Sequence, residues 1–563
     1  MNPITTETSA PLPEELLNQL AQSLRRTIAD LYGEAQPSIR FEAPRRPEFG
    51  DFSTNIAFAL TRIARRSPKE VADLLIQRLR VDEPQLAESF SEIASVDGFL
   101  NVRLAPAAWQ QRIAQILREG GAFGQQPANG QTISLEFGSA NPTGPLVVVQ
   151  GRTTSIGATL TNAFRYCGYG VFTEWIINDA GAQLDTLGHS LYARYRQTWD
   201  PQFALPENGY PGDYLLPLAK ELAEREGDRW CDAPQERWLP HFSSFARDHL
   251  VAQQQATVER FGIAFDLWQS ERSLHDSGAV GAGLARLDAA QATYERDGAL
   301  YFRASAFDDD KDRVLIRSDG RPTYLAVDVA YHYDKLRRAD RVIDILGPDH
   351  HGYIGRLQGL AEALGYKGAL DVLIAQQITL MRGEEQISMS KRAGHIITLD
   401  EILDEVGKDA ARFYFVMLAP DSPLTFDLEL AKEQSNDNPV YYVQYGHARI
   451  ASVLKNASAR DLESLRANVP ALTSLVHMTE LALARRLSEL PSVAQNTVHH
   501  LAPHRLTRYA RDVASDFHQF YTECKILVEE HELRLARLAL CIATKHVLAR
   551  VLALIGVTAP DSM

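Results

Sequence analysis

Cysteine is scarce in this sequence, and it has no long apolar run. The 563 residues include four cysteines, which lie far apart and form no Cys-x-x-Cys pair. This spacing argues against a disulfide framework and a cysteine-based zinc site. The most apolar stretch, around Leu538 to Val557, is broken by Lys545 and Arg550 and falls short of the ~18 residues that a membrane span needs. The first residues show no signal-peptide pattern. We therefore expect a cytoplasmic protein without membrane contact.

Several familiar catalytic motifs are also missing. The sequence contains no GxxxxGK[ST] loop, no GxGxxG fingerprint, no HExxH helix and no GxSxG elbow. P-loop NTPases, simple dehydrogenases, zinc metallopeptidases and serine hydrolases are therefore disfavoured. His350 and His351 are adjacent, but neighbouring side chains point in different directions and no third ligand is placed by spacing. We expect no metal held by protein side chains.

Positive charge is in deficit, but unevenly. The formal net charge of −14 argues mildly against a nucleic-acid partner, because phosphate contacts need Lys and Arg. Residues 431–563, however, carry 15 Lys and Arg against 13 Asp and Glu, whereas the rest of the chain carries 43 against 59. The C-terminal part is thus compatible with a polyanionic partner. Random variation in surface charge explains the difference equally well.

The hydrophobic pattern divides the chain into three parts. Helical periodicity and a strand-like pair come first, followed by the linker-like segment GGAFGQQPANGQ. A strand (QTISLEF), a helix (GRTTSIGATLTNAF) and a second strand (VFTEWIIND) then predict a β-α-β unit. Amphipathic helices fill the C-terminal part. The expected domains are a small α+β domain at 1–120, a Rossmann-type α/β domain at 131–400 with a helical insertion at about 185–300, and an all-α bundle at 401–563.

The first candidate site lies where FGSANPTGP ends an apolar strand and leads into a helix. Ligands of open α/β sheets bind beyond the carboxyl ends of the strands, and a helix N-terminus offers unpaired N–H groups to an anion. Glu136 lies in this strand and Asn141 in the turn. Asn-Pro-Thr-Gly is also simply a good turn sequence, and taken alone the two interpretations carry equal weight.

Three further segments carry polar side chains suited to ligand binding. GPDHHGY follows another apolar strand and offers Asp349 and His350 to a sugar or phosphate. EEQISMSKRAGH carries Lys391, which suits neutralisation of a polyphosphate leaving group. PTYLAVDVAYHYDKL places Tyr324 and Asp328 four residues apart, on one helical face, where they suit a cation. Taken singly, an exposed turn or a structural pair explains each segment.

These segments occur in one order ahead of a helical bundle, and this combination resembles the arginyl-tRNA synthetases, a family of class I aminoacyl-tRNA synthetases. FGDFSTNIAF at 49–58 is similar to the family's N-terminal domain, which contacts the tRNA D-loop corner. SANPTGPL is similar to the segment before the HIGH motif, GPDHHGYI to the ATP-site turn and SMSKRAG to the KMSK loop. NPVYYVQYGHARIASVL at 438–454 is similar to the start of the anticodon-binding domain. The resemblance implies a Rossmann-type class I catalytic domain between two tRNA-binding domains.

The implied activity is ligation of arginine to its tRNA. Arginine and ATP, with Mg²⁺, form arginyl-adenylate, and the arginyl group then passes to the 3′-end of arginine tRNA. A guanidinium requires carboxylates and hydroxyls around it, which agrees with the residues found. We expect a monomer. The resemblance implies arginine binding by Glu136, Asn141, Tyr324 and Asp328. It implies ATP binding by Gly144, Gln150, Asp349, His350, Met389, Ser390 and Lys391, of which Gln150 and Lys391 are catalytic.

Aromatic residues mark the expected tRNA contacts. Phe49, Phe52 and Asn55 lie on a short stretch that suits stacking and hydrogen bonding of an unstacked loop base. Tyr441, Tyr445 and Arg449 lie close together at the start of the C-terminal bundle. A place in the core is an equally good explanation for Tyr445.

The chain departs from the family at the HIGH motif. Val147 and Gln150 stand where the family has its two histidines, Val149 replaces the glycine, and Ser388 replaces the first lysine of KMSK. Loss of one transition-state donor lowers rates by about 10²–10³. Two hypotheses follow: an active ligase with a divergent ATP site, which the intact arginine pocket favours, and a catalytically impaired paralogue that binds tRNA or arginine.

Overall fold

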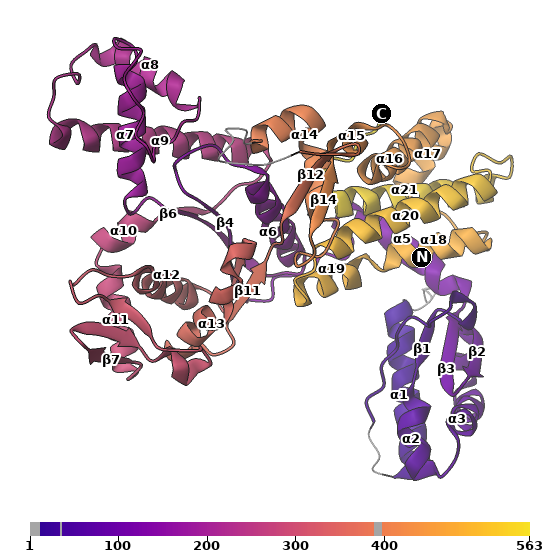
Figure 1. The fold of residues 1–563 in the computed structure, drawn as a ribbon. Helices are drawn as coiled ribbons and strands as arrows, with labels where there is room; N and C mark the ends of the chain where they lie inside the picture. The colour runs from indigo at the N-terminus through magenta and orange to yellow at the C-terminus, as the bar shows by residue number, and fades with distance from the viewer. Residues whose placement is uncertain (1–11, 34–36, 388–396) are drawn as a thin grey trace, which may run out of the picture.

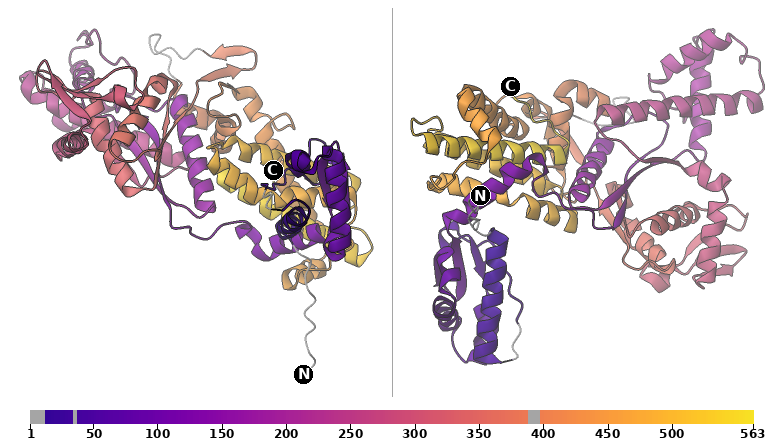
Figure 2. Two further views of the ribbon diagram at one scale, coloured as in Figure 1. Left: turned by 90° about the horizontal axis from the view of Figure 1, so that it is seen from below. Right: turned by 180° about the vertical axis from the view of Figure 1, so that it is seen from behind.

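The computed structural model describes residues 12–33, 37–387 and 397–563. A central α/β domain lies between a helical insertion on one side and a C-terminal helical bundle on the other, and a small α+β domain lies below the bundle in Figure 1. The views in Figure 2 show the same arrangement from two further directions. The predicted fold class, α/β with an N-terminal α+β domain and a C-terminal all-α bundle, is confirmed.

The N-terminal domain packs helices against a three-stranded antiparallel sheet of order β1-β3-β2. The sequence SPKE begins one of these helices, α3, with a capping box: the Ser67 hydroxyl accepts from the Glu70 N–H, and the Glu70 carboxylate accepts from the Ser67 N–H at 2.8 Å. The elements are α1 (Pro13–Tyr32), η1 (Pro47–Phe49), β1 (Phe52–Thr54), α2 (Ile56–Ala64), α3 (Pro68–Asp82), α4 (Pro84–Glu88), β2 (Phe90–Val96), β3 (Phe99–Leu104), α5 (Pro106–Glu119) and η2 (Gly120–Ala122).

Helix α5 joins this domain to the C-terminal bundle. It packs against α18 and α21, and the Gln110 side-chain amide donates to the Leu475 carbonyl at 3.1 Å. The last residues of the segment 1–120 therefore lie, in space, with the helical bundle (Figure 1).

The α/β domain is built on a five-stranded parallel sheet of order β11-β10-β4-β5-β6. From β4 the chain adds strands first on one side and later on the other, so the strand order reverses between β4 and β10. A crevice beyond the carboxyl ends of the strands is the usual ligand site at such a switch point. The elements of the sheet and its connections are β4 (Thr132–Ala140), α6 (Val148–Tyr166), β5 (Gly170–Ile177), β6 (Leu267–Ser270), α12 (Tyr324–Arg338), β10 (Arg341–Leu346), η4 (Pro348–Tyr353), α13 (Ile354–Ala363) and β11 (Leu370–Ile374).

The segment 185–300, which the sequence predicts as one helical insertion, is divided by β6. This strand pairs with β5 and belongs to the main sheet. Its four residues, LWQS, are too short and too mixed in polarity to show strand periodicity, which is why sequence analysis does not find it. The first insertion holds α7 (Gln183–Arg196), α8 (Leu215–Glu226) and α9 (Gln235–Arg260). The second holds α10 (Glu271–Asp276), α11 (Ala279–Ala289), β7 (Thr293–Arg296), β8 (Ala299–Phe302), η3 (Ala304–Phe307) and β9 (Arg313–Ile316).

A separate three-stranded sheet, of order β13-β12-β14, lies between the main sheet and the bundle. The segment DVLIAQQITLM supplies β11 to the main sheet and β12 to this one. The elements here are β12 (Ile378–Arg382), β13 (Glu385–Ile387), α14 (Leu399–Val416), β14 (Leu424–Asp427) and α15 (Leu428–Lys432).

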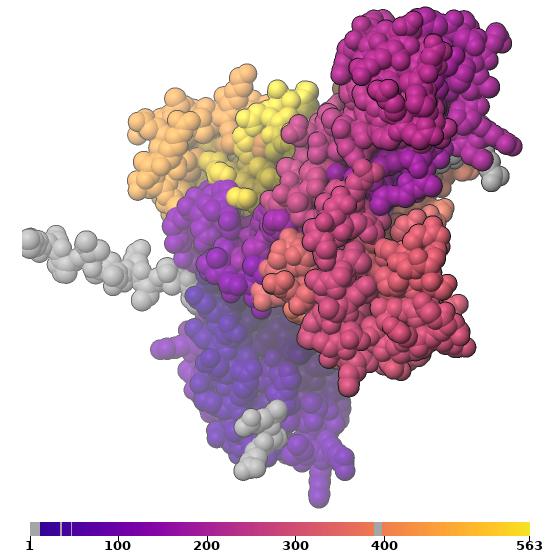
Figure 3. Space-filling model, turned by 90° about the vertical axis from the view of Figure 1, so that its left-hand side faces the viewer, coloured from indigo at the N-terminus to yellow at the C-terminus, as the bar shows by residue number. Residues whose placement is uncertain are grey.

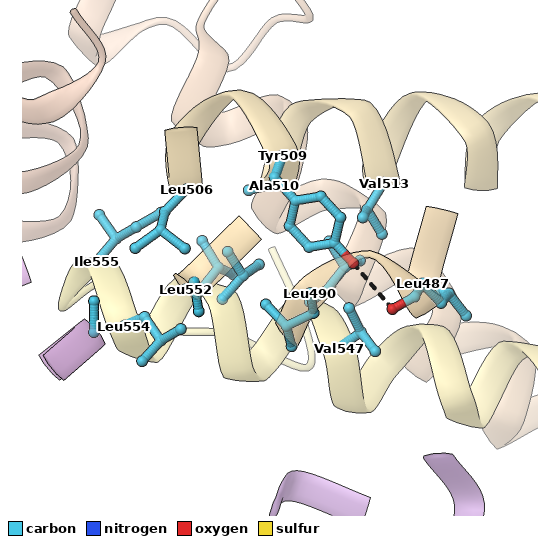
Figure 4. Close-up of a cluster of buried hydrophobic side chains, with 14 of the residues drawn as sticks. Leu487, Leu490, Leu506, Tyr509, Ala510, Val513, Val547, Leu552, Leu554 and Ile555 are labelled. Carbon is cyan, nitrogen blue, oxygen red and sulfur yellow. Dashed lines mark hydrogen bonds between the residues drawn. The ribbon is translucent and has the colours of Figure 1, made fainter. Parts of the chain in front are cut away.

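The C-terminal bundle packs long apolar helix faces together. Figure 4 shows Leu506 and Val513 of α20 above Val547 and Leu552 of α21, and the Tyr509 hydroxyl donates to the Leu487 carbonyl at 3.2 Å. The expectation that the stretch around Leu538 to Val557 is too short for a membrane span is wrong, because helix α21 is long and apolar enough to cross a membrane. Most of its residues, however, are buried among α5, α6, α16 and α20. The helices are α16 (Pro439–Asn456), α17 (Ala459–Ala467), α18 (Met478–Ser488), α19 (Leu490–His499), α20 (His504–Glu523) and α21 (His531–Ile555).

Candidate active site

One face of helix α12 carries a row of polar side chains toward the main sheet. Tyr324, Asp328, His332 and Lys335 follow one another at helical spacing. Burial deepens along the row: Tyr324 is 67% exposed, Asp328 is half-buried, and Lys335 has no exposed surface. The row therefore runs from the mouth of the site into the protein interior.

Three carboxylates on neighbouring strands lie beneath this row. Glu136 on β4 is in register with Asp344 on β10 and with Glu174 on β5. Like charges this close destabilise a sheet unless cations compensate them. The ammonium of Lys335 donates to Glu136 at 2.7 Å and to Asp344 at 2.6 Å, and the guanidinium of Arg338 donates to Glu174 at 2.9 Å.

The buried network around Asp344 is held in its charged form. His332 lies with Nε2 2.8 Å from the Asp344 carboxylate and Nδ1 2.8 Å from the Asp328 carbonyl. Burial works to raise the pKa of Asp344, but Lys335 and His332 outweigh it and hold that pKa at about 2. Burial works against charged Lys335, but Asp344 and Glu136 raise its pKa above the ordinary value. Burial raises the pKa of Glu136, and Lys335, which donates to it at 2.7 Å, works against that shift, so Glu136 has a cationic partner within the protein.

A cavity of about 280 Å³ opens between this network and the carboxyl ends of the strands. It brings together five residues that the sequence predicts for the site. These are Glu136, Asn141, Tyr324, Asp328 and His350. Asp349 lies outside the cavity, with its side chain exposed on η4.

Two carboxylates in the cavity wall have no ion-pair partner within residues 12–33, 37–387 and 397–563. One is Asp328; the other is Glu271, the first residue of α10, which is 7% exposed. Burial, with Asp328 and Asp179 nearby, raises the pKa of Glu271 to about 7. Burial also raises the pKa of Asp328. A cation entering the cavity would relieve both effects, so the site is built for positive charge.

Sequence analysis missed Lys335 and Glu271. Lys335 lies eleven residues after Tyr324 on the same helical face, so its spacing was a usable signal. Glu271 follows the short strand β6, and no motif of the sequence marks it.

Helix α6 begins at Val148, seven residues after Asn141 of the cavity wall. Val147 is the N-cap residue, and its N–H donates to the Gln150 side-chain oxygen at 3.1 Å. This bond leaves the amide N–H groups of Gln150 as donors. The Gly144 carbonyl accepts from the buried Gln254 amide at 2.9 Å, which fixes the turn before α6. Val149 lies half-buried against the core.

The predicted residues Met389, Ser390 and Lys391 lie outside the described residues, as does Ser388. The elements on either side of them are described. β13 ends at Ile387, and α14 begins after Thr398, whose hydroxyl accepts from the Glu401 N–H. The Leu399 N–H donates to the Leu146 carbonyl at 2.8 Å, so α14 starts beside the first turn of α6.

The predicted tRNA contacts of the N-terminal domain divide between two places. Phe49 and Asn55 line a cavity of about 660 Å³, together with Arg40. Phe52 does not line it: its ring stacks on Trp109 of α5, with centroids 6.5 Å apart, and packs against the core. In Figure 3 this domain and the helical insertion both stand out from the rest of the molecule.

The predicted contacts of the bundle form one cluster. Tyr441 and Tyr445 stack with ring centroids 5.8 Å apart on α16. The Arg449 guanidinium lies 4.6 Å from the Tyr445 ring centroid and 5.0 Å from that of Tyr521 on α20, and it donates to the Tyr445 hydroxyl at 2.8 Å. All three α16 side chains are half-buried.

Comparison with known proteins covers each part of the chain. Family models match at residues 18–104 (arginyl tRNA synthetase N terminal domain), 238–415 (tRNA synthetases class I (R), catalytic domain) and 443–563 (DALR anticodon binding domain). A curated relative from Moorella thermoacetica, named arginine–tRNA ligase, is 41% identical over the full length of both chains.

Solved structures that are similar to this chain also include arginyl-tRNA synthetases. A putative arginyl-tRNA synthetase from Campylobacter jejuni is 32% identical, with a TM-score of 0.75 over 82% of this chain and 100% of that one. The arginyl-tRNA synthetase of Thermus thermophilus, at 22% identity, shares the fold with a TM-score of 0.75 over 97% of this chain and 100% of that one.

The parallel sheet with its cavity at the switch point, the helical bundle and the catalytic-domain match define a class I aminoacyl-tRNA synthetase. The sequence identity over the full length identifies the family more narrowly than the fold does. The chain belongs to the arginyl-tRNA synthetase family and is an ATP-dependent ligase that joins arginine to tRNA. The active-ligase hypothesis is thereby supported, and the comparisons give no support to an impaired paralogue.

Proposed function

We propose that arginine binds in the 280 Å³ cavity with its guanidinium between Asp328 and Glu271. The observation that carries this assignment is that these two carboxylates have no ion-pair partner in the described parts of the chain, while Lys335 already neutralises Glu136. Tyr324 at the mouth supplies a hydroxyl. Asn141, at the carboxyl end of β4, is placed to hold the α-amino group.

In this proposal Glu136 acts mainly by holding Lys335 in place. It remains part of the cavity wall, as the sequence predicts, but its charge is shared with the ammonium at 2.7 Å. A second carboxylate for the guanidinium then comes from Glu271, which strand β6 and helix α10 bring to the cavity.

ATP lies, in this proposal, at the N-terminus of α6, where backbone N–H groups and Gln150 face the phosphates. Gly144, Asp349 and His350 complete the site on the described side, and Met389, Ser390 and Lys391 belong to it by their motif. The described residues contain no cluster of His, Cys, Asp and Glu fit to hold a metal. The donors here suit anions, so we propose that Mg²⁺ arrives bound to the ATP phosphates, which supply oxygen ligands.

Catalysis then follows from position and charge. The arginine carboxylate attacks the α-phosphorus of ATP, pyrophosphate leaves, and Lys391 and Gln150 stabilise the charge that develops on the phosphates. The 3′-end of arginine tRNA next attacks the adenylate carbonyl, and AMP leaves. The Gly144 turn, held by Gln254, keeps the α6 N-terminus at a fixed distance from the cavity.

The direct test is charging of arginine tRNA by the purified protein with ATP, Mg²⁺ and arginine. We expect charging with arginine and none when lysine replaces it. A folded protein that binds arginine in calorimetry but charges no tRNA would restore the impaired-paralogue hypothesis, for which the Val147 and Gln150 replacements are the motivating observation.

We further propose that tRNA contacts two places. One is the 660 Å³ cavity lined by Phe49 and Asn55, and the other is the cluster of Tyr441, Tyr445 and Arg449. Bases stack on such aromatic and guanidinium planes. The double variant Phe49→Ala with Asn55→Ala should raise the tRNA KM while the ATP and arginine KM values stay constant. Phe52→Ala is the matched control, because Phe52 packs on Trp109 and should affect stability more than tRNA affinity. A rise in tRNA KM confined to Phe52→Ala would contradict the assignment.

Two further proposals concern the location of the protein in the cell and its oligomeric state. We propose a cytoplasmic monomer without membrane contact, since the apolar helix α21 is enclosed by the bundle. Light scattering coupled to gel filtration tests the monomer, with a dimer mass as the contrary result.

A further inference from the structure

Arg152 is a buried cation without a hydrogen-bonded carboxylate in the described structure. It lies in the second turn of α6, is 1% exposed, and its Nη1 and Nη2 groups donate, within the described residues, to main-chain oxygens; Nε has no partner there. Nη1 donates to the carbonyls of Gln376 at 2.8 Å and Gln377 at 3.3 Å, and Nη2 to those of Ala419 at 3.1 Å and Ser422 at 2.7 Å. Burial lowers its pKa to about 10, which leaves the guanidinium charged at neutral pH.

The four carbonyls mark the beginnings of two strands. Gln376 and Gln377 directly precede β12, and Ala419 and Ser422 lie in the turn before β14. β12 and β14 pair in parallel, starting from Ile378 and Leu424. One guanidinium from α6 therefore holds the start of β12, the central strand of the sheet β13-β12-β14, and the start of β14 beside it.

A second connection joins the start of α6 to α14, the helix that lies between β13 and β14 in sequence. The Leu399 N–H of α14 donates to the Leu146 carbonyl, and Val147 forms a bridge with Thr398. A Cβ at Gly151 would lie 2.8 Å from Leu399, so glycine permits this close approach. Arg152 thus fixes the starts of β12 and β14 to the second turn of α6, and α14 starts beside the residues that precede α6; β13 is connected to this arrangement through its pairing with β12.

The geometry points to Arg152 as a positioning residue for the ATP half of the reaction. It sets the sheet β13-β12-β14, and with it the end of β13 at Ile387, at a fixed place relative to the α6 N-terminus and Gln150. A lysine places one compact ammonium where the planar guanidinium reaches four oxygens at once, so the function requires arginine. This inference rests on the proposed ATP site at α6.

Arg412 provides a matched control. It is also 1% exposed, its pKa is also lowered to about 10 by burial, and it donates to one carbonyl, that of Ile555 at 2.8 Å. That bond joins α14 to α21, inside the bundle and away from the α6 N-terminus. Loss of either arginine removes charge-assisted hydrogen bonds to main-chain carbonyls in the interior and lowers stability.

The experiment compares Arg152→Met, Arg152→Lys and Arg412→Met in tRNA charging, arginine calorimetry and thermal unfolding. A misplacement of about 1 Å lowers rates by about 10²-fold, so we expect Arg152→Met to lose about 100-fold in kcat. Its ATP KM should change, and its arginine Kd should stay within about twofold of wild type because the arginine cavity is built from other elements. Arg152→Lys should fall between Arg152→Met and wild type.

Arg412→Met should lose thermal stability while keeping kcat within about threefold of wild type at a temperature at which it is folded. Equal kcat losses in Arg152→Met and Arg412→Met, or an arginine Kd that rises as much as kcat falls, would overturn the inference. If Arg152→Met does not fold, Arg152→Lys decides, and its wild-type kcat would overturn the inference. A wild-type protein that fails to charge tRNA refutes the proposed function instead.

Discussion

The two halves of the site are built in opposite ways. The arginine half is a set of buried charges: Lys335 joins Glu136 to Asp344, and Asp328 and Glu271 face the cavity. Within the described residues, the proposed ATP half is mainly a helix N-terminus, one amide side chain and the exposed turn at Asp349 and His350. A fixed cationic ligand needs fixed counter-charges, whereas polyphosphate needs donors, and the backbone supplies many of those.

This difference predicts which side chains each half can lose without losing its function. A backbone N–H keeps its position whatever side chain follows it, so Val147 and Val149 leave the α6 N-terminus intact. The backbone offers no comparable substitute for Lys335, because its removal leaves two buried carboxylates, Glu136 and Asp344, without their ammonium partner. The contrast predicts different responses to substitution on the two sides.

The largest expected effect is on stability, from Lys335→Met. Without the ammonium, Glu136 and Asp344 face each other in the interior, and the free energy of unfolding should fall by about 3–5 kcal/mol. Denaturant unfolding measures this. Lys367→Met, which breaks an exposed ion pair with Glu362, serves as the control and should change little. A small effect of Lys335→Met would mean that the arginine half does not depend on fixed charge.

The next largest expected effect is on kcat, from Lys391→Ala on the ATP side. With no imidazole at positions 147 and 150, few side-chain donors remain for the phosphates, so kcat should fall by about 10²–10³. Arginine affinity, measured by calorimetry, should be unchanged. Arg392→Ala, a neighbouring cation without an implied role, is the control. A loss in Lys391→Ala below about tenfold, or about 1.4 kcal/mol, would show that the phosphates are held elsewhere.

A smaller effect, on arginine affinity, should distinguish the role of Asp328 from that of Glu136. Asp328→Asn removes a charge-assisted partner of the guanidinium and should weaken arginine binding by about 1.5–3 kcal/mol, with the ATP KM little changed. Glu136→Gln should weaken arginine binding less and stability more, because its main partner is Lys335. Equal losses of arginine affinity in both variants would place the guanidinium against Glu136 as well.

Much of the fold follows from local sequence pattern. The strand QTISLEF, the helix after it and the strand VFTEWII have strong periodicity and clear turns, and each is present as β4, α6 and β5. β6 was not predictable, because four residues at a sheet edge acquire strand geometry only by pairing with β5. The break between β11 and β12 could not be predicted from local sequence either, since it arises because the two strands join different sheets.

The candidate site shows the same limit. Glu136, Tyr324 and Asp328 could be chosen from one strand and one helix face. Their electrostatic state could not, because it depends on the register that sets Glu136 beside Asp344 and on Lys335 reaching both. Glu271 enters the cavity only through the path of the chain after β6, which no local pattern contains.

The smallest effect is a pH dependence that belongs to the arginine half alone. Glu271 has a pKa of about 7 before a ligand binds, so below pH 7 the carboxyl group must release a proton when the guanidinium arrives. Arginine affinity should therefore rise with pH toward a plateau above about pH 8 and weaken by up to tenfold per pH unit below 7. Glu271→Gln should bind arginine more weakly at pH 8 and lose this dependence. Asp328 and His332, which also face the cavity, remain in that variant. Calorimetry from pH 6 to pH 8.5 measures both, and an unchanged slope in Glu271→Gln would assign the titration to Asp328 or His332 and remove Glu271 from the guanidinium site.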